Sequence, residues 1–144
     1  MNTSFYKKLT VIVSVVVLAV AAFASFSTRT ASAIYDWDAA YVSQNVPTTL
    51  RVNEQVTVTV TMQNVGLQTW DSANGIKLSS QNPTDNFNWG RTRVDLGSNL
   101  VHQNQVAIFS FTIKAPSNPG TYNFQWRMTK DVAPGGWFGD YTPN

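Results

Sequence analysis

Side chains that commonly perform catalysis are scarce in this chain of 144 residues. It has no cysteine and a single histidine, His102, which lies in the polar stretch SNLVHQNQ. A thiol nucleophile is therefore excluded, and no serine sits in a nucleophile-elbow pattern that would give His102 a partner. A Ser/His/Asp set can be assembled from distant positions of almost any sequence, so its availability alone indicates nothing. We predict that His102 is a surface or turn residue and that the protein is not an enzyme; a secreted hydrolase is the least favoured alternative.

Two acidic clusters offer oxygen atoms of the kind that bind calcium. In one cluster, Asp36 and Asp38 flank Trp37. The other has one carboxylate and three amides: Asp85, Asn82, Asn86 and Asn88. Neither has the carboxylate spacing of a calcium loop. We predict that these are solvated loop residues, with no metal and no cofactor.

Aromatic residues are the remaining candidates for ligand contact. Trp89, Trp137 and Tyr141 lie in Gly- and Asn-rich surroundings, where a ring that is exposed could stack on a sugar. The alternative is that these rings cap the ends of a folded core, because large aromatic side chains are usually mostly buried. A carbohydrate-binding module is therefore one hypothesis, with these three residues as its contacts.

The charge of the chain is unevenly placed. The formal net charge is +2, but three of the ten basic residues lie in the first 33 positions: Lys7, Lys8 and Arg29. All eight acidic residues lie beyond them, so the remainder has seven basic and eight acidic residues. A segment that is close to neutral lacks the electrostatic footprint of a nucleic-acid-binding protein. We therefore expect no nucleic-acid partner.

The first 33 residues have the layout of an export signal. A polar, positive start over 1–8 precedes an uncharged, Val- and Ala-rich stretch over 9–26, and Ala31-Ser32-Ala33 then forms an A-x-A site. This order predicts a secretory signal peptide over 1–33 that forms an N-terminal helix and is cleaved after Ala33. The alternative is an uncleaved anchor, which would be the protein's sole contact with a membrane. Either way, we expect a secreted or cell-surface protein that folds without disulfides.

Two-residue periodicity in the rest of the chain predicts β-strands. Over 54–63, EQVTVTVTMQ alternates apolar and hydroxyl side chains, and over 121–130 aromatic residues alternate with polar ones. The strand over 105–114 changes phase, because Val106 and Ile108 share one parity while Phe109, Phe111 and Ile113 share the other. Such a change favours either a β-bulge or a strand covered on both faces.

Weaker strand patterns occur over 67–70, 76–80 and 89–96, with a polar loop over 80–88. Turn chemistry separates the segments, above all in APSNPG over 115–120, because its prolines lack the N–H that a helix requires. Short strands at regular spacing predict an all-β sandwich.

Three ordered pieces carry a resemblance to a known family: NVGLQTW at 64–70, APSNPGTYNFQWRM at 115–128 and GGWFGD at 135–140. Together they resemble the four-tryptophan (FW) immunoglobulin-like domain, first described in the Next-to-BRCA autophagy receptor and widespread in secreted bacterial proteins. The resemblance implies an immunoglobulin-like antiparallel β-sandwich of about seven strands over 45–144, preceded by a lead over 34–44.

The resemblance also implies roles for eight motif residues. It places Asn64 and Gly66 in a turn and Trp70 on the next strand. Pro119 and Gly120 come before a late strand, and Trp126 lies within that strand. Phe138 and Gly139 form the Phe-Gly pair near the end of the family's motif. Gly66 and Gly120 can adopt the positive φ that tight turns commonly need. Trp70 and Trp126 would bury large rings where a classical immunoglobulin domain has a Trp beside a disulfide.

The sequence departs from the family at two places. Val60 stands where the family often has a tryptophan, so Trp89 and Trp137 would complete the count. The family usually continues past the Phe-Gly pair into a closing strand, whereas this sequence stops four residues after Asp140. Either the sequence is a truncated fragment or the final edge strand is missing. An exposed edge would favour self-association by strand exchange.

These features favour a secreted or surface, non-catalytic Ig-like module for protein interaction, or an accessory or spacer domain. The expected partner is a protein or a polysaccharide at the cell exterior.

Overall fold

The computed structural model describes residues 35–144. The expected signal peptide and its cleavage site lie outside the described residues. The described part has no helix, and hence none that could cross a membrane.

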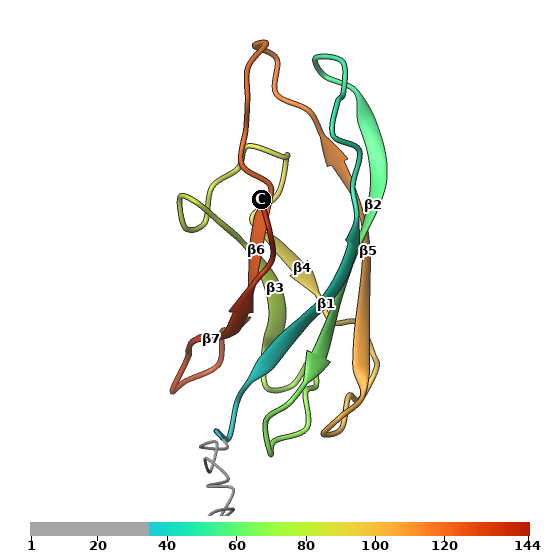
Figure 1. Ribbon diagram of the computed structural model, residues 1–144. Coiled ribbons are helices and arrows are strands. Elements are labelled where there is room, and N and C mark those ends of the chain that lie inside the picture. Colours follow the sequence, from blue (N-terminus) through green and yellow to red (C-terminus); the bar gives the residue numbers. More distant parts are fainter. Residues whose placement is uncertain (1–34) are drawn as a thin grey trace, which may run out of the picture. The chain divides into compact units, whose positions relative to one another are not determined.

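Seven strands form two antiparallel sheets (Figure 1). One sheet has the order β1-β2-β5 and the other the order β4-β3-β6-β7. In chain order the strands are β1 (Ala39–Asn45), β2 (Gln55–Asn64), β3 (Ile76–Gln81), β4 (Arg93–Asp95), β5 (Val106–Lys114), β6 (Gln125–Lys130) and β7 (Gly136–Tyr141). The predicted immunoglobulin-like β-sandwich of about seven strands is confirmed.

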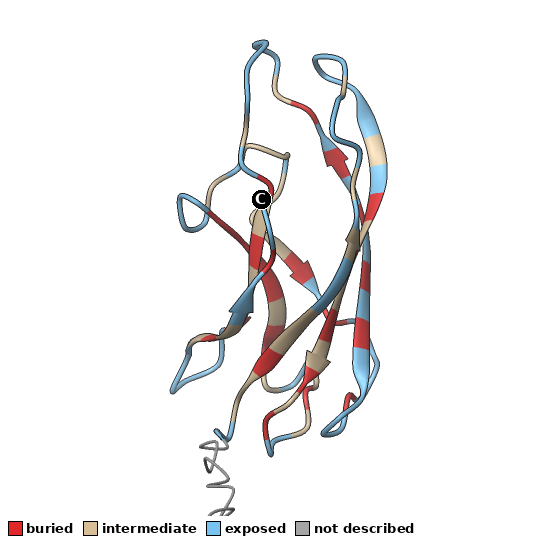
Figure 2. Ribbon diagram, viewed as in Figure 1, coloured by how far each residue is buried: buried red, intermediate tan, exposed pale blue. Residues whose placement is uncertain are grey.

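The core lies between the two sheets, where buried residues alternate with exposed ones along the strands (Figure 2). In β2, Val58, Val60 and Met62 are buried, as the alternation predicted. Trp70 and Trp126 are fully buried, and because the sequence has no cysteine, these large rings fill the space without a covalent link between the sheets. Aromatic packing is therefore a principal support of the sandwich.

The phase change predicted for β5 has a different explanation from the two that we favoured. β5 pairs with β2 in unbroken register from Gln63↔Val106 to Gln55↔Lys114, so it has no bulge. Its residues alternate strictly between exposed and buried, with Ala107 continuing the buried phase. Val106 and Ile108 are exposed apolar side chains on the outer face, 50% and 68% accessible.

The segment over 67–70 is not the strand that the sequence predicted. Its backbone bonds instead to the segment that precedes β1: Leu67 N donates to Tyr35 O, and Gln68 N donates to Asp36 O. Trp70 makes only an isolated bridge to Val101. The weak strand over 89–96 is likewise confined to the three residues of β4. At 67–70, pairing with distant backbone overrides the local strand propensity.

The final edge strand, whose absence was one of the two alternatives, is present as β7. Phe138 and Gly139 lie inside it rather than before it, and β7 pairs with β6. All of β1 except its last residue lies within the predicted lead over 34–44. β1 packs near β7, where Tyr41 N donates to Asp140 Oδ2 over 3.1 Å. The premise of strand exchange, an absent final strand, is therefore not met.

Substitution of Gly139 is expected to separate the sheets where β7 meets β1. Gly139 has φ +71°, and a Cβ added there would lie 2.6 Å from the backbone N of Ala39. We expect Gly139→Ala to lower the free energy of unfolding by at least about 2 kcal/mol, measured by urea denaturation. Gly97→Ala is the matched control, because Gly97 has φ +77° but open space around it. Equal losses in the two variants would contradict a role for the close approach.

Candidate interaction face on the β6–β7 edge

Two of the three predicted contact residues come together on one strand. Trp137 and Tyr141 are both on β7, opposite Thr129 and Arg127 of β6 respectively. The register shifts between Arg127 and Met128, so β7 has extra residues around Gly139. Phe138 points into the core, whereas Trp137 and Tyr141 share the outer face of the four-stranded sheet.

An arginine side chain lies against each of these two rings. The guanidinium carbon of Arg93 lies 5.2 Å from the centroid of the Trp137 ring, and that of Arg127 lies 4.6 Å from the centroid of Tyr141. Arg127 also donates from Nε to Gly139 O over 2.9 Å and from Nη1 to the Tyr141 hydroxyl over 3.2 Å. Cation–π contact and these hydrogen bonds hold the side chains in one arrangement.

The two arginines differ in their electrostatic surroundings. Arg93 forms ion pairs with Asp85 and Asp131, and the hydrogen bond to Asp85 raises the pKa of Arg93 above its ordinary value. In contrast, no carboxylate in the described part of the chain forms an ion pair with Arg127. Arg127 is thus a positive charge available to a partner, beside the half-exposed ring of Tyr141.

Trp89, the third predicted contact, lies elsewhere and packs against other aromatic rings. Its ring meets those of Tyr122 and Phe124 at centroid distances of 6.4 and 5.7 Å, in edge-to-face geometry. Its indole N–H donates to Asn123 O over 2.8 Å. These contacts fit the alternative reading, in which the ring caps an end of the sandwich.

A pocket of 410 Å³ adjoins Trp137 on the side of the residues preceding β1. Tyr35, Trp37 and Lys130 contribute to its lining. Lys130 Nζ lies 5.6 Å from the centroid of the Trp37 ring and donates to the carbonyl oxygens of Val132 and Pro134. The sequence did not predict that Trp37 adjoins this face. The one sequence feature that set Trp37 apart was its position between two aspartates.

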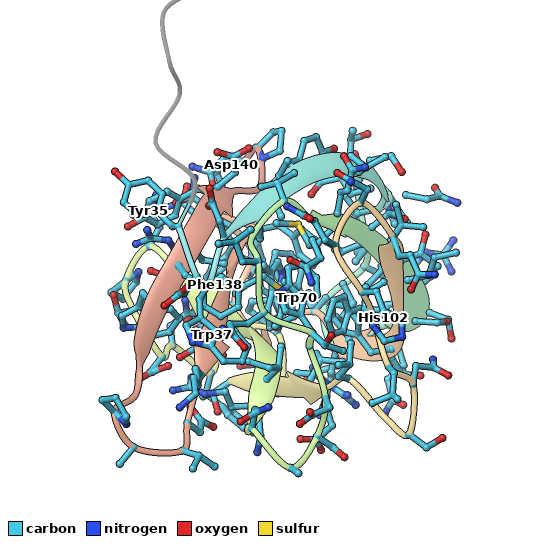
Figure 3. The ribbon with its side chains drawn as sticks, turned by 90° about the horizontal axis from the view of Figure 1, so that it is seen from below. Tyr35, Trp37, Trp70, His102, Phe138 and Asp140 are labelled. Carbon is cyan, nitrogen blue, oxygen red and sulfur yellow. The ribbon has the colours of Figure 1, made fainter. Side chains whose placement is uncertain are left out.

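A row of aromatic rings leads from this pocket into the core. The ring of Phe138 neighbours those of both Trp37 and Trp70, with centroid distances of 6.2 and 5.9 Å (Figure 3). His102 lies on the other side of Trp70 in this view and is exposed. Its Nδ1 is 3.0 Å from Thr69 Oγ1, and its backbone N donates to Gln105 Oε1. The surface position predicted for His102 agrees with the structure.

The acidic clusters have structural contacts of their own. Asp38 Oδ1 accepts from the N of Ala39, and Asp85 pairs with Arg93. Asn86 donates to the carbonyl oxygens of Gln81 and Pro83 within the loop between β3 and β4. Residues 35–144 bring together no group of three or more His, Cys, Asp or Glu side chains with metal-binding geometry.

The motif residues of the first turn form one buried network. Asn64 Nδ2 donates to Gln68 O and to Val101 O, each over 2.8 Å, and Asn64 Oδ1 accepts from Gly66 N over 3.1 Å. The predicted positive φ of Gly66 is wrong. Glycine is needed there because a Cβ would lie 2.6 Å from Asp38 N and 2.7 Å from Asp36 O.

The later motif residues support the core from β6. Pro119 and Gly120 lie in the loop before β6, and Gly120 likewise lacks the predicted positive φ. A Cβ on Gly120 would lie 3.3 Å from the Tyr122 ring. Trp126 packs against Phe111 and Phe124 at centroid distances of 5.0 and 5.7 Å.

Two antiparallel sheets around a tryptophan-rich core without a disulfide form an immunoglobulin-like sandwich. Residues 45–141 match the family described as "Ig-like domain from next to BRCA1 gene", and the chain belongs to this family. Immunoglobulin-like domains of this kind are in general non-catalytic and mediate protein interactions. No curated protein matches the sequence.

Proposed function

We propose that the protein is an exported, non-catalytic module, free or attached to a larger protein as an accessory or spacer domain, that binds a protein at the cell exterior. Membership of the family supports protein interaction. The basic and apolar residues of 1–33, followed by the A-x-A site, support export. A fold alone does not identify a ligand, so the choice of partner class rests on a site.

The site that carries this proposal is the β6–β7 face, which we define as Arg93, Arg127, Trp137 and Tyr141. Tryptophan, tyrosine and arginine are the residue types that contribute most to binding energy in protein interfaces. Here they are held in place by mutual contacts before any partner binds, which lowers the entropic cost of association. Arg127 provides a charge for a carboxylate of the partner.

The same geometry favours a protein over a polysaccharide. A sugar ring stacks on an open aromatic face, but Trp137 and Tyr141 each already have a guanidinium within 5.2 and 4.6 Å of the ring centroid. A sugar would have to displace these cations or use the opposite side of each ring. A carboxylate-bearing protein surface can contact arginine and ring together, so it makes use of the observed arrangement.

The double variant Arg127→Ala/Trp137→Ala tests this face. The chain is expressed from residue 1, its appearance outside the cell is scored first, and the exported protein is immobilised and exposed to proteins from the cell exterior. We expect the immobilised wild type to retain a partner protein. The amount of that partner retained by the double variant should be lower by about tenfold or more, because both a charge and an aromatic contact are lost. Thr57→Ala, on the outer face of the other sheet, is the control and should leave retention unchanged.

Three outcomes would contradict the proposal. The first is a chain found only inside the cell, where it could not meet a partner at the cell exterior. The second is equal retention by the double variant and the wild type, which would place binding elsewhere. The third is a change in intrinsic tryptophan fluorescence when polysaccharides are added to the wild type and none when they are added to Trp137→Ala, which would identify a carbohydrate-binding module instead.

A further inference from the structure

The free edge of β5 is the least protected strand edge of the described residues. β5 is the last strand of the sheet β1-β2-β5, so only β2 pairs with it. At its end, Lys114 N donates away from β2, to Trp89 O, over 3.0 Å. Alternate residues of an antiparallel strand point their backbone groups to the same side. Four further residues of β5 therefore direct N–H and C=O groups to the free edge: Val106, Ile108, Ser110 and Thr112.

The other three edge strands carry features that oppose pairing with another chain. β1 has a bulge between Tyr41 and Ser43, and β7 has a register shift together with Asp140. β4 is only three residues long and contains Arg93 and Asp95. Charges, bulges and shortness are the usual protections of a sheet edge. β5 has none of them over VAIFSFTI, which is regular and contains no charge, proline or glycine.

The side chains along this edge are also suited to contact. Ile108 is 68% exposed and Val106 is 50% exposed. Together with Leu100, which is 60% exposed, they line a hollow of 290 Å³ beside the strand. The outer face continues across β2 as Thr57, Thr59 and Thr61, which are uncharged.

We propose that a second copy of this chain occupies the β5 edge. In this dimer the two β5 strands pair antiparallel about a two-fold axis at Phe109. Ile108 then faces Ser110 of the second copy, and Val106 faces Thr112. This register pairs every free backbone group of the four edge residues, and the two sheets become continuous across the junction.

The absence of charge at the four free positions of this edge favours a second copy as the occupant. A two-fold interface is isologous, so side chains near the axis approach their own copies. A charged residue at 106, 108, 110 or 112 would place like charges close together, whereas the four residues present are neutral. The edge lies on the opposite sheet from the β6–β7 face, so the dimer and the proposed function can fail separately.

Sedimentation velocity of the chain expressed from residue 1, over a range of concentrations, tests the dimer. We expect Ile108→Lys to raise the dimer dissociation constant by about tenfold or more. The substitution removes an apolar contact. It also places two ammonium groups diagonally across the axis, on two residues whose backbones are about 7–8 Å apart. Ser43→Lys makes the same change of charge on β1, at the far edge of the same sheet, and should leave the constant unchanged.

A second variant tests the register. Ile108→Lys/Ser110→Asp places each new ammonium opposite a new carboxylate of the second copy and should restore the dimer. Thermal unfolding of each variant, followed by circular dichroism, confirms that it is folded. A wild-type chain that stays monomeric at all concentrations would overturn the proposal, as would a monomer that binds a foreign extended peptide at β5. A dimer that Ile108→Lys leaves intact would do the same.

Discussion

Replacing Trp126 with alanine is expected to lower the free energy of unfolding by about 3–5 kcal/mol. Trp126 is fully buried on β6, and its ring packs edge-to-face on Phe111 of β5 and on Phe124. Phe111 belongs to the opposite sheet, so the variant loses contacts between the two layers as well as buried apolar area. A domain of this size has a total stability of about 5–15 kcal/mol, so the variant retains only a small part of it.

Urea denaturation followed by circular dichroism measures this loss. Trp126→Phe is the matched control, because it keeps an aromatic ring and removes an indole N–H that has no protein acceptor among residues 35–144. We expect its loss to be less than half of that of Trp126→Ala. Trp137→Ala should cost less than about 1 kcal/mol, since Trp137 lies on the outer face. Equal losses for Trp126→Ala and Trp137→Ala would show that the core ring has no special role.

Asn64→Ala is expected to cost about 3 kcal/mol or more. The side chain is fully buried and makes three hydrogen bonds, to Gln68 O, Val101 O and Gly66 N. Each buried group that loses its partner costs about 1–3 kcal/mol. The bonds join the turn after β2 to the residue that bridges Trp70, so the loss extends to the packing of that ring.

Two further variants separate hydrogen bonding from shape at this position. Asn64→Asp keeps the shape but turns a carboxylate oxygen toward two carbonyl oxygens, and we expect it to cost at least as much as Asn64→Ala. Gln63→Ala, next to it in β2, removes one bond from a half-buried residue to Asn104 O and should cost less than about 1 kcal/mol. An Asn64→Asp variant as stable as the wild type would contradict the network.

The strands that were predictable are those whose pattern is local. Along β2, valine and threonine alternate, and along β6, Trp126 and Met128 alternate with polar residues, so burial on one face follows from strand geometry. β7 was not predictable in this way. Its Gly136 and Gly139 are typical of loops, and the strand forms because Gly139 lets it approach Ala39.

The candidate site was predictable in its residue types and not in its arrangement. Trp137 and Tyr141 were identified because they are aromatic and lie in a Gly-rich segment. Their partner Arg93 is distant in sequence, and only the sheet order β4-β3-β6-β7 brings it onto the Trp137 ring. Trp89 has the same kind of surroundings in the sequence, but it packs against Phe124, so composition alone did not distinguish the two tryptophans.

The central claim is that a protein partner binds the β6–β7 face, and NMR of the tryptophan side chains tests it most directly. The chain has five tryptophans, so ¹⁵N labelling yields five indole N–H signals. On addition of the retained partner, we predict that the signal of Trp137 shifts together with the backbone signals of Arg127 and Tyr141. The signals of Trp70 and Trp126, which lie in the core, should stay in place. A shift of the Trp89 signal with none at Trp137 would contradict the account.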